Sequence, residues 1–174
     1  METLVRPPRT GMEAFKLMPE GTYCQLINDV LVMSPAPTTP HARVQRKIFV
    51  ELNEFIEREL LGEVFHSPID VYLNNKNAYQ PDILFISSNK KGIVKRRGIF
   101  GAPDLVIEIL SEDKNYDLKK KKKVYEQSGV KEYWVVDPET KWCEGFILED
   151  QQYKSAGEFM GSLRIQTLGL EIKF

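Results

Sequence analysis

The sequence predicts an α/β domain, in which helices pack against a sheet. Apolar residues recur at helical spacing over residues 41–61, whereas the short apolar runs 103–110 and 132–136 are bounded by turn residues, as strands are. A second helical segment, residues 114–128, separates these two runs. Strands that alternate with helices in this way are typical of α/β folds.

Length and composition are those of one soluble globular unit. The chain has 174 residues, within the usual size of a domain, so we expect a single domain over residues 1–174 with a flexible segment at 1–9. Hydrophobic residues make up 42%, charged residues 28%, and the mean hydropathy is -0.34. No apolar stretch approaches the roughly 18 residues of a membrane span, and the N-terminus lacks the apolar core of a signal peptide. We therefore expect a cytoplasmic protein without a membrane partner.

The charge and the cysteines exclude several classes of protein. A net charge of -1 argues against a protein that binds nucleic acid mainly by bulk electrostatics. Any such contact must come from the two local basic clusters, at 87–101 and 119–123. Cys24 and Cys143 lie far apart and match no zinc-ligand or redox spacing, so a disulfide scaffold or zinc ribbon is not expected.

Local signals define the elements of the first half. Thr10 and Glu13 form a capping-box pattern that opens a short helix to about Met18. The long helix over residues 41–61 follows a proline-rich loop, with Thr39 as its candidate cap and Gly62 as its candidate end. The expected strands are 23–27 and 30–33, which form an N-terminal hairpin, then 64–66, 69–73 and 81–86, with a turn at 74–77.

The second half alternates loops, strands and one helix. Residues 87–101 are expected to form a basic loop that leads into the strand 103–110. The helix over 114–128 should end at Gly129. The remaining expected strands are 132–136, then 142–148 and 152–154 as a C-terminal hairpin, and 170–174 as an edge.

Glu108 is the most informative residue, because it lies in the middle of the apolar strand 103–110. A charge in a buried strand is costly unless it is paired or holds a metal. Two interpretations follow. Glu108 is a structural charge paired with a lysine, or it is kept for chemistry.

The lysine run 119–123 cannot lie entirely on a solvated face. At about 100° per residue, five successive positions surround a helix. With Leu118 at 0°, Lys121 falls near 300°, between Val124 and Tyr125, so it shares the apolar side. Asp117 lies one turn before it. A buried ammonium needs an acidic partner, so we expect Lys121 to meet one.

Asp82 and Glu108 are the candidate partners, since each lies on a strand expected beside this helix. Two carboxylates from neighbouring strands with one lysine suit a divalent cation that polarises a phosphoryl oxygen and activates water. Asp82 taken alone also fits a residue that caps a turn or begins its strand after Pro81.

Several blocks of the sequence, in this order, give a family resemblance. They are Met33 to Pro37, His41, Pro81-Asp82, the block 103–110 with Glu108, Asp117 with Lys121 and Tyr125, and Gly129-Val130-Lys131-Glu132-Tyr133-Trp134-Val135-Val136-Asp137-Pro138. With them the chain, from about Thr10 onward, resembles the Uma-type family of bacterial endonucleases. That family is placed in the PD-(D/E)xK, restriction-endonuclease-like superfamily.

The resemblance implies a restriction-endonuclease-like core, with a central mixed sheet flanked by helices. It further implies that Asp82, Glu108 and the main-chain carbonyl of Ile109 bind Mg²⁺ or Mn²⁺. The superfamily usually has a lysine two residues after the acid, where this chain has Leu110. Lys121 fits the role from the following helix, to orient or deprotonate the attacking water and to offset phosphorane charge. Gln25 replaces a glutamate that the family often shows.

Other polar residues have two interpretations each. Asp104 shares a face with Glu108, but four residues of strand place it about 13 Å away, which favours strand-edge solvation. Asp70 could reach the same pocket from an adjacent strand. His41 is a cap-region residue or a group behind the metal ligands, Asp117 holds Lys121 or caps the helix, and Tyr125 is a core residue or turns its hydroxyl to the site. The cluster Lys90, Lys91, Lys95, Arg96 and Arg97 is a solvated loop or a contact for backbone phosphates.

The function predicted from the sequence is a Mg²⁺- or Mn²⁺-dependent endonuclease that hydrolyses DNA phosphodiester bonds. The alternative is a catalytically inactive module on the same fold that binds nucleic acid or protein; a third possibility is a hydrolase of another phosphoester. Intact Asp82, Glu108 and Lys121 favour the enzyme, whereas the near-neutral charge favours the alternative. A homodimer is expected because cutting both strands of a duplex suits two symmetric sites.

Overall fold

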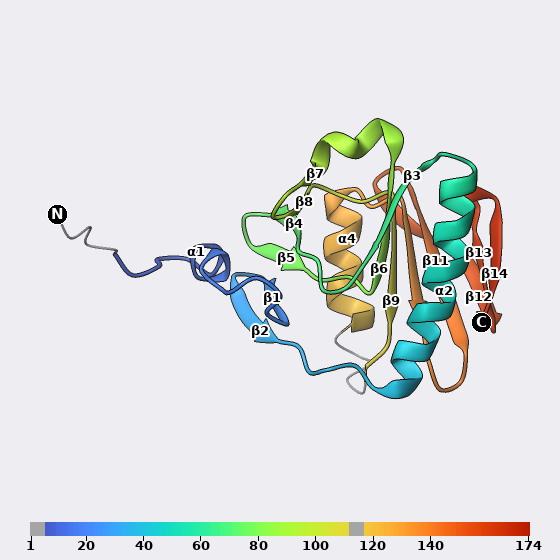
Figure 1. Cartoon of the computed structure of the whole chain (residues 1–174), viewed down its shortest axis with the longest axis horizontal. Helices are drawn as coiled ribbons and strands as arrows, with labels where there is room; N and C mark the ends of the chain where they lie inside the picture. The colour runs from blue at the N-terminus through green and yellow to red at the C-terminus, as the bar shows by residue number, and fades with distance from the viewer. Residues whose placement is uncertain (1–5, 112–116) are drawn as a thin grey trace.

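The computed structural model describes residues 6–111 and 117–174, without the side chains of Asp117 and Leu118. It places one helix on each face of a central sheet, and the N-terminal elements extend to one side (Figure 1). The expected flexible segment 1–9 lies partly outside the described residues, as does the start of the helix expected at 114. In the part described, no helix is both long and apolar enough to span a bilayer.

The central sheet has six strands in the order β12-β11-β10-β9-β6-β3. β9 and β10 run parallel, and the other neighbours are antiparallel, so the sheet is mixed as expected. Apolar runs in β6, β9 and β10 form its buried middle because both faces are covered. The strands are β3 (Gly62–His66), β6 (Ile83–Ser87), β9 (Leu105–Ile109), β10 (Glu132–Val136), β11 (Trp142–Glu149) and β12 (Gln152–Met160).

Helix α2 (Thr39–Arg58) covers one face of this sheet. Its buried apolar residues recur at helical spacing and pack with residues of β6, β9 and β10. The helix begins at Thr39, two residues earlier than expected, and its cap is Thr38 rather than Thr39, because the Thr38 hydroxyl accepts the His41 N–H. It also ends earlier, at Arg58, and Leu60 takes the left-handed conformation expected for Gly62, with a φ of 55°.

The opposite face is covered by α4 (Lys122–Ser128), which follows a single π-helical segment, η2 (Asp117–Lys121). Its residues Val124 and Tyr125 pack with apolar side chains from alternate positions of β6, β9 and β10. Gly129 ends the helix in the left-handed conformation, with a φ of 86°, as the sequence predicts.

A second sheet, in the order β2-β1-β5-β4-β8-β7, was not predicted as a separate unit. It contains the expected N-terminal hairpin, whose turn Asn28-Asp29 has positive φ at both residues. Helix α1 (Gly11–Lys16) packs on it, capped by Thr10 as expected. Its strands are β1 (Cys24–Ile27), β2 (Val30–Met33), β4 (Val71–Asn74), β5 (Asn77–Tyr79), β7 (Val94–Lys95) and β8 (Gly98–Phe100).

The prediction of a loop over 87–101 was wrong in part. Residues Ser88–Ile93 form a 3₁₀ helix (η1), and β7 and β8 then form a tight hairpin. These elements are too short to show an apolar period. The C-terminal hairpin is confirmed as β11 and β12. The strand expected at 170–174 is present as β14 (Leu170–Lys173), but it is not an edge of the central sheet. It forms a separate two-stranded sheet with the unpredicted β13 (Ser162–Ile165), to which the 3₁₀ helix η3 (Gln166–Leu168) connects it, and it contacts α2.

Candidate active site

The candidate site lies where the start of β6 meets the end of β9. Ile83 pairs with Ile107 in antiparallel register, so Asp82 and Glu108 are opposite one another one residue further on. Residues directly opposite in such a pair have Cβ atoms about 4.5–5.5 Å apart. Both carboxylates line a cleft of about 800 Å³. The sequence prediction that these two acids come together is therefore met by the backbone register.

Glu108 is almost fully buried, with 3% of its surface exposed. Its Oε1 accepts hydrogen bonds from the Tyr125 hydroxyl at 2.6 Å and from Lys121 Nζ at 3.2 Å. Both donors come from the segment that packs on the sheet, which explains why they were found from the helical period. Burial of the Tyr125 hydroxyl, and after it the charge of Glu108, raises the pKa of Tyr125 well above its usual value, so the hydroxyl stays protonated and donates.

Lys121 is the inward lysine that the run 119–123 requires. It is 5% exposed and also lines the cleft, whereas Lys119, Lys120 and Lys123 are exposed. The π-helical segment changes the angles calculated for a regular α-helix, but the inward position is the same. The ion pair with Glu108 satisfies the ammonium that would otherwise be costly to bury.

Asp82 is held by contacts to its side chain and to its backbone. Its Oδ2 accepts the Ile109 backbone N–H at 2.7 Å and lies 3.2 Å from His41 Nε2. Its backbone carbonyl accepts Gln45 Nε2 at 2.9 Å. The other carboxylate oxygen, Oδ1, accepts no hydrogen bond from residues 6–111 or 117–174, and Asp82 lines the cleft.

His41 therefore lies behind Asp82, as one of the two interpretations predicted. Burial lowers the pKa of His41, but the hydrogen bond to Asp82 and the charges of Asp82 and Glu108 outweigh it, so the pKa is raised overall. The N–H and C=O of one strand residue point to the same side, so the Ile109 carbonyl faces the side on which the Ile109 N–H donates to Asp82.

The donor set fits a small hard cation. No group of three or more His, Cys, Asp and Glu side chains in the described ranges is arranged to hold a metal. Mg²⁺ needs less, because it keeps several waters and is commonly held by one or two carboxylates. Asp82, whose Oδ1 accepts no hydrogen bond from the described part of the chain, Glu108 and the Ile109 carbonyl offer three oxygen ligands of the kind that Mg²⁺ and Mn²⁺ prefer.

The sequence assigned no role to two glutamines of the cleft. Gln45 bonds Ser67 Oγ and the Asp82 carbonyl, and lies one helical turn after His41, a spacing that could have revealed it. Gln25 donates to Ser34 Oγ and accepts the Gln80 N–H, so it connects the cleft wall to the segment before Asp82. A glutamine there supplies hydrogen bonds without a third negative charge.

Two sequence interpretations are corrected. Asp70 does not reach this cleft; it lies in a separate hollow with Tyr72 and Gln80. Asp104 is not solvated at an edge, because it is 3% exposed and paired with Lys131 and Lys90. Lys90, one of the basic cluster that could contact backbone phosphates, therefore already has an ion pair with Asp104.

The side chain of Asp117 lies outside the described part, so neither of its roles is tested. Tyr125 satisfies both of its interpretations. It is fully buried, and its hydroxyl reaches Glu108.

The fold and the family agree with this geometry. The structure is similar to the crystal structure of a putative nuclease of the DUF820 family from Anabaena variabilis, with a TM-score of 0.77 and 19% identity over 95% of each chain. This likeness confirms the restriction-endonuclease-like fold. The Uma2 family, described as putative restriction endonuclease, matches residues 12–172, and the chain belongs to that family. A search of curated proteins gave no match.

Proposed function

We propose that the protein is a Mg²⁺- or Mn²⁺-dependent endonuclease that hydrolyses DNA phosphodiester bonds. One observation supports it above the others. Two carboxylates from adjacent strands, Asp82 and Glu108, face one cleft together with a buried lysine. We place the whole activity in a single restriction-endonuclease-like domain and expect a homodimer.

Asp82, Glu108 and the Ile109 carbonyl would hold the cation. A cation bound there supplies Lewis-acid polarisation of the phosphoryl oxygen and lowers the pKa of bound water. Each protein ligand is fixed before substrate arrives. Asp82 is held by the Ile109 N–H and by His41, and Glu108 is held by Tyr125 and Lys121.

Lys121 has a second role in the proposal. Its ammonium is paired with Glu108 in the lining of the cleft, and in this proposal it offsets the negative charge that develops on the phosphoryl group. Because the segment that contains it packs on the sheet, the charge is in place before the reaction and needs no rearrangement.

Nicking of supercoiled plasmid tests the proposal. We expect wild type to nick DNA with Mg²⁺ or Mn²⁺ and not with EDTA. Glu108→Gln should reduce the rate by about a hundredfold to a thousandfold, the range known for loss of one central stabilising group. Glu63→Gln is the matched control, because Glu63 is an exposed glutamate on the edge strand β3; it should leave the rate unchanged.

The alternative, an inactive module that binds nucleic acid or protein, is supported by the net charge of -1. The two proposals differ in their response to metal. Binding of DNA without nicking, by wild type in either metal, would establish the module; equal nicking by wild type and Glu108→Gln would remove the catalytic assignment.

A further inference from the structure

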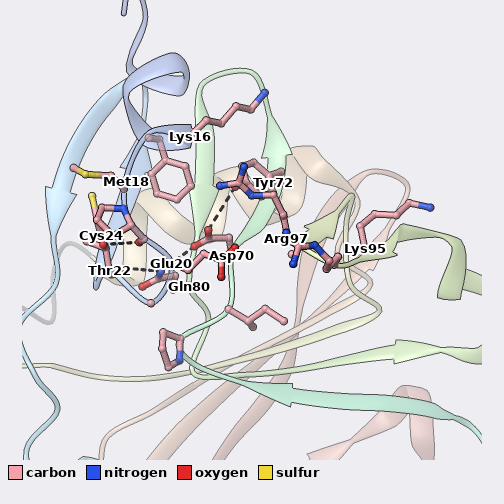
Figure 2. A pocket seen from close by; sticks show the side chains of 17 residues that line it. Lys16, Met18, Glu20, Thr22, Cys24, Asp70, Tyr72, Gln80, Lys95 and Arg97 are labelled. Carbon is pink, nitrogen blue, oxygen red and sulfur yellow. Dashed lines mark hydrogen bonds between the residues drawn. The ribbon is translucent and has the colours of Figure 1, made fainter.

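A second hollow, the side pocket, lies next to the cleft. It has a volume of about 230 Å³ and lies between α1, β4 and the β7-β8 hairpin (Figure 2). Pockets for drug-sized ligands measure about 300–1,000 Å³, so this one admits a single ring system and little more. Gln80 lines both the side pocket and the cleft.

Asp70 and Gln80 lie together within the side pocket (Figure 2). Asp70 accepts Gln80 Nε2 at 2.9 Å and, more weakly, the Tyr72 hydroxyl at 3.5 Å, while Gln80 also donates to the Thr22 carbonyl at 2.9 Å. Burial raises the pKa of Asp70, and the opposing effects of these donors and of the Arg97 charge do not cancel it. The carboxylate would therefore gain from a further hydrogen-bond donor.

The outside of the side pocket is basic. Lys95, Arg96 and Arg97 are exposed around the turn of the β7-β8 hairpin, and Lys16 adds a cation from α1. Glu20 is the second acid of the lining, and it is exposed. Cations outnumber acids in the lining, and Arg97 is the cation whose charge acts on Asp70.

The acidic interior and the basic outside of the side pocket together favour one kind of ligand. A phosphate suits the exposed arginines, but the Asp70 carboxylate would repel it from the interior. A planar base with an amino group suits the interior, because a carboxylate accepts hydrogen bonds from such groups. A nucleotide has both parts, one at each end.

We propose that the side pocket binds one unpaired nucleotide of the nucleic-acid strand, with its base at Asp70 and its phosphate at Arg96 and Arg97. The base is one that bears an amino group, namely adenine, cytosine or guanine. The inference rests on the proposed nuclease function, because Gln80 is two residues from Asp82, at most about 7 Å of chain. A strand with one phosphate in the cleft can therefore place a neighbouring nucleotide in the side pocket.

Binding of labelled single-stranded oligonucleotides to the full chain, measured by fluorescence anisotropy in EDTA, tests this without cleavage. We expect oligo-dC or oligo-dA to bind at least about fivefold more tightly than oligo-dT, since thymine lacks the amino group. Asp70→Asn, which keeps the shape of the side chain, should remove this preference and leave oligo-dT binding unchanged. Equal binding of all three oligonucleotides by wild type would overturn the proposal.

Arg97→Gln supplies an independent measurement, because Arg97 is exposed and its loss should not affect folding. We expect weaker binding of every oligonucleotide and a shallower salt dependence. Lys173→Gln, an exposed cation on β14, is the matched control and should change neither. Identical behaviour of Arg97→Gln and Lys173→Gln would contradict the assignment of the phosphate.

The source of the nucleotide is tested by competition with dCMP. We expect dCMP to compete far more weakly than an oligonucleotide, because it lacks contacts along the cleft; competition at equal concentrations would show a site for free nucleotides and overturn the strand proposal. The base preference is measured without metal. If wild type nicks DNA but shows no base preference, only this inference is contradicted. If wild type shows the base preference but does not nick DNA, only the proposed nuclease function is contradicted.

Discussion

The two ends of the parallel strands β9 and β10 hold buried carboxylates in very different surroundings. At one end, Glu132 is fully buried and accepts four hydrogen bonds, from Trp134 Nε1, the Gln166 N–H, and the N–H and hydroxyl of Thr167, all between 2.6 and 2.9 Å. At the other end, Glu108 is held by Tyr125 and Lys121 and lines the cleft.

Asp104 belongs with Glu132, at the start of β9. It is paired with Lys131 at 2.7 Å and Lys90 at 3.3 Å, and it accepts the Ser87 N–H and hydroxyl at 2.9 and 2.7 Å. Neither Asp104 nor Glu132 lines the cleft. Both connect distant segments of the chain by hydrogen bonds. Glu132 binds the 3₁₀ helix η3, and Asp104 binds the end of β6.

The comparison teaches that burial of a carboxylate in a strand does not by itself indicate chemistry. Glu132 and Glu108 are both in apolar strands, and the reasoning that selected Glu108 applies equally to Glu132. What distinguishes Glu108 is a second acid opposite it and an opening to solvent. Substitution of a structural carboxylate should lower the stability of the fold, whereas substitution of a site carboxylate should weaken metal binding.

The largest effect on stability is expected from Glu132→Gln. The amide nitrogen would face donors that now point at a carboxylate oxygen, so at least one buried donor loses its acceptor. We expect the free energy of unfolding to fall by about 3 kcal/mol. Urea denaturation measures it, and a change below about 1 kcal/mol would show that Glu132 is not the structural acid described.

The next effect is the pH dependence that Asp104 contributes. Burial opposes ionisation, but Lys131, Ser87 and Lys90 together lower the pKa of Asp104 from 3.8 to about 2. Because the folded pKa is the lower one, the stabilisation is complete above about pH 4 and is lost as the pH falls through about 2. Its size is about 2 kcal/mol.

Denaturant midpoints of wild type and Asp104→Asn between pH 2 and 6 test this. The difference in stability between the two should be largest at pH 6 and should shrink as the pH approaches 2. A difference that is constant over this range would contradict the lowered pKa.

A smaller effect is expected from the cation. At Mg²⁺ ten times above its dissociation constant, wild type should be stabilised by about 1.4 kcal/mol relative to EDTA. Glu132→Gln should keep this increment, whereas Glu108→Gln should lose it. An equal response in both variants would remove the distinction between the two ends of the sheet.

The sequence predicted those parts of the fold that are long and strongly patterned. The strand with Glu108, the strand 132–136 and the inward Lys121 follow from apolar runs and from the helical period, which are local properties. The pairing of Asp82 with Glu108 was also found, because each acid has its own strand signal.

The remainder depends on contacts between distant segments. The strands 77–79, 94–95, 98–100 and 162–165 are too short to show a period. Asp104 was placed at a solvated edge because its partners Lys90 and Lys131 lie on other elements. Asp70 was given as a residue that could reach the cleft, because the second sheet, which sets its position in the side pocket, was not predicted.

The smallest of these effects is expected from Tyr125→Phe, which keeps the ring but removes the donor at 2.6 Å from Glu108. The ring contacts with Tyr79 and Tyr133 remain, so the loss of stability should be about 1 kcal/mol. Tyr153→Phe is the matched control, since that hydroxyl donates to the Val130 carbonyl at 2.9 Å. Both variants should lose similar stability in urea and keep the response to Mg²⁺, because Lys121 still holds Glu108. If Tyr125→Phe alone loses the Mg²⁺ response, the hydroxyl is needed to hold Glu108 for the cation, and Tyr125 belongs to the site rather than to the core.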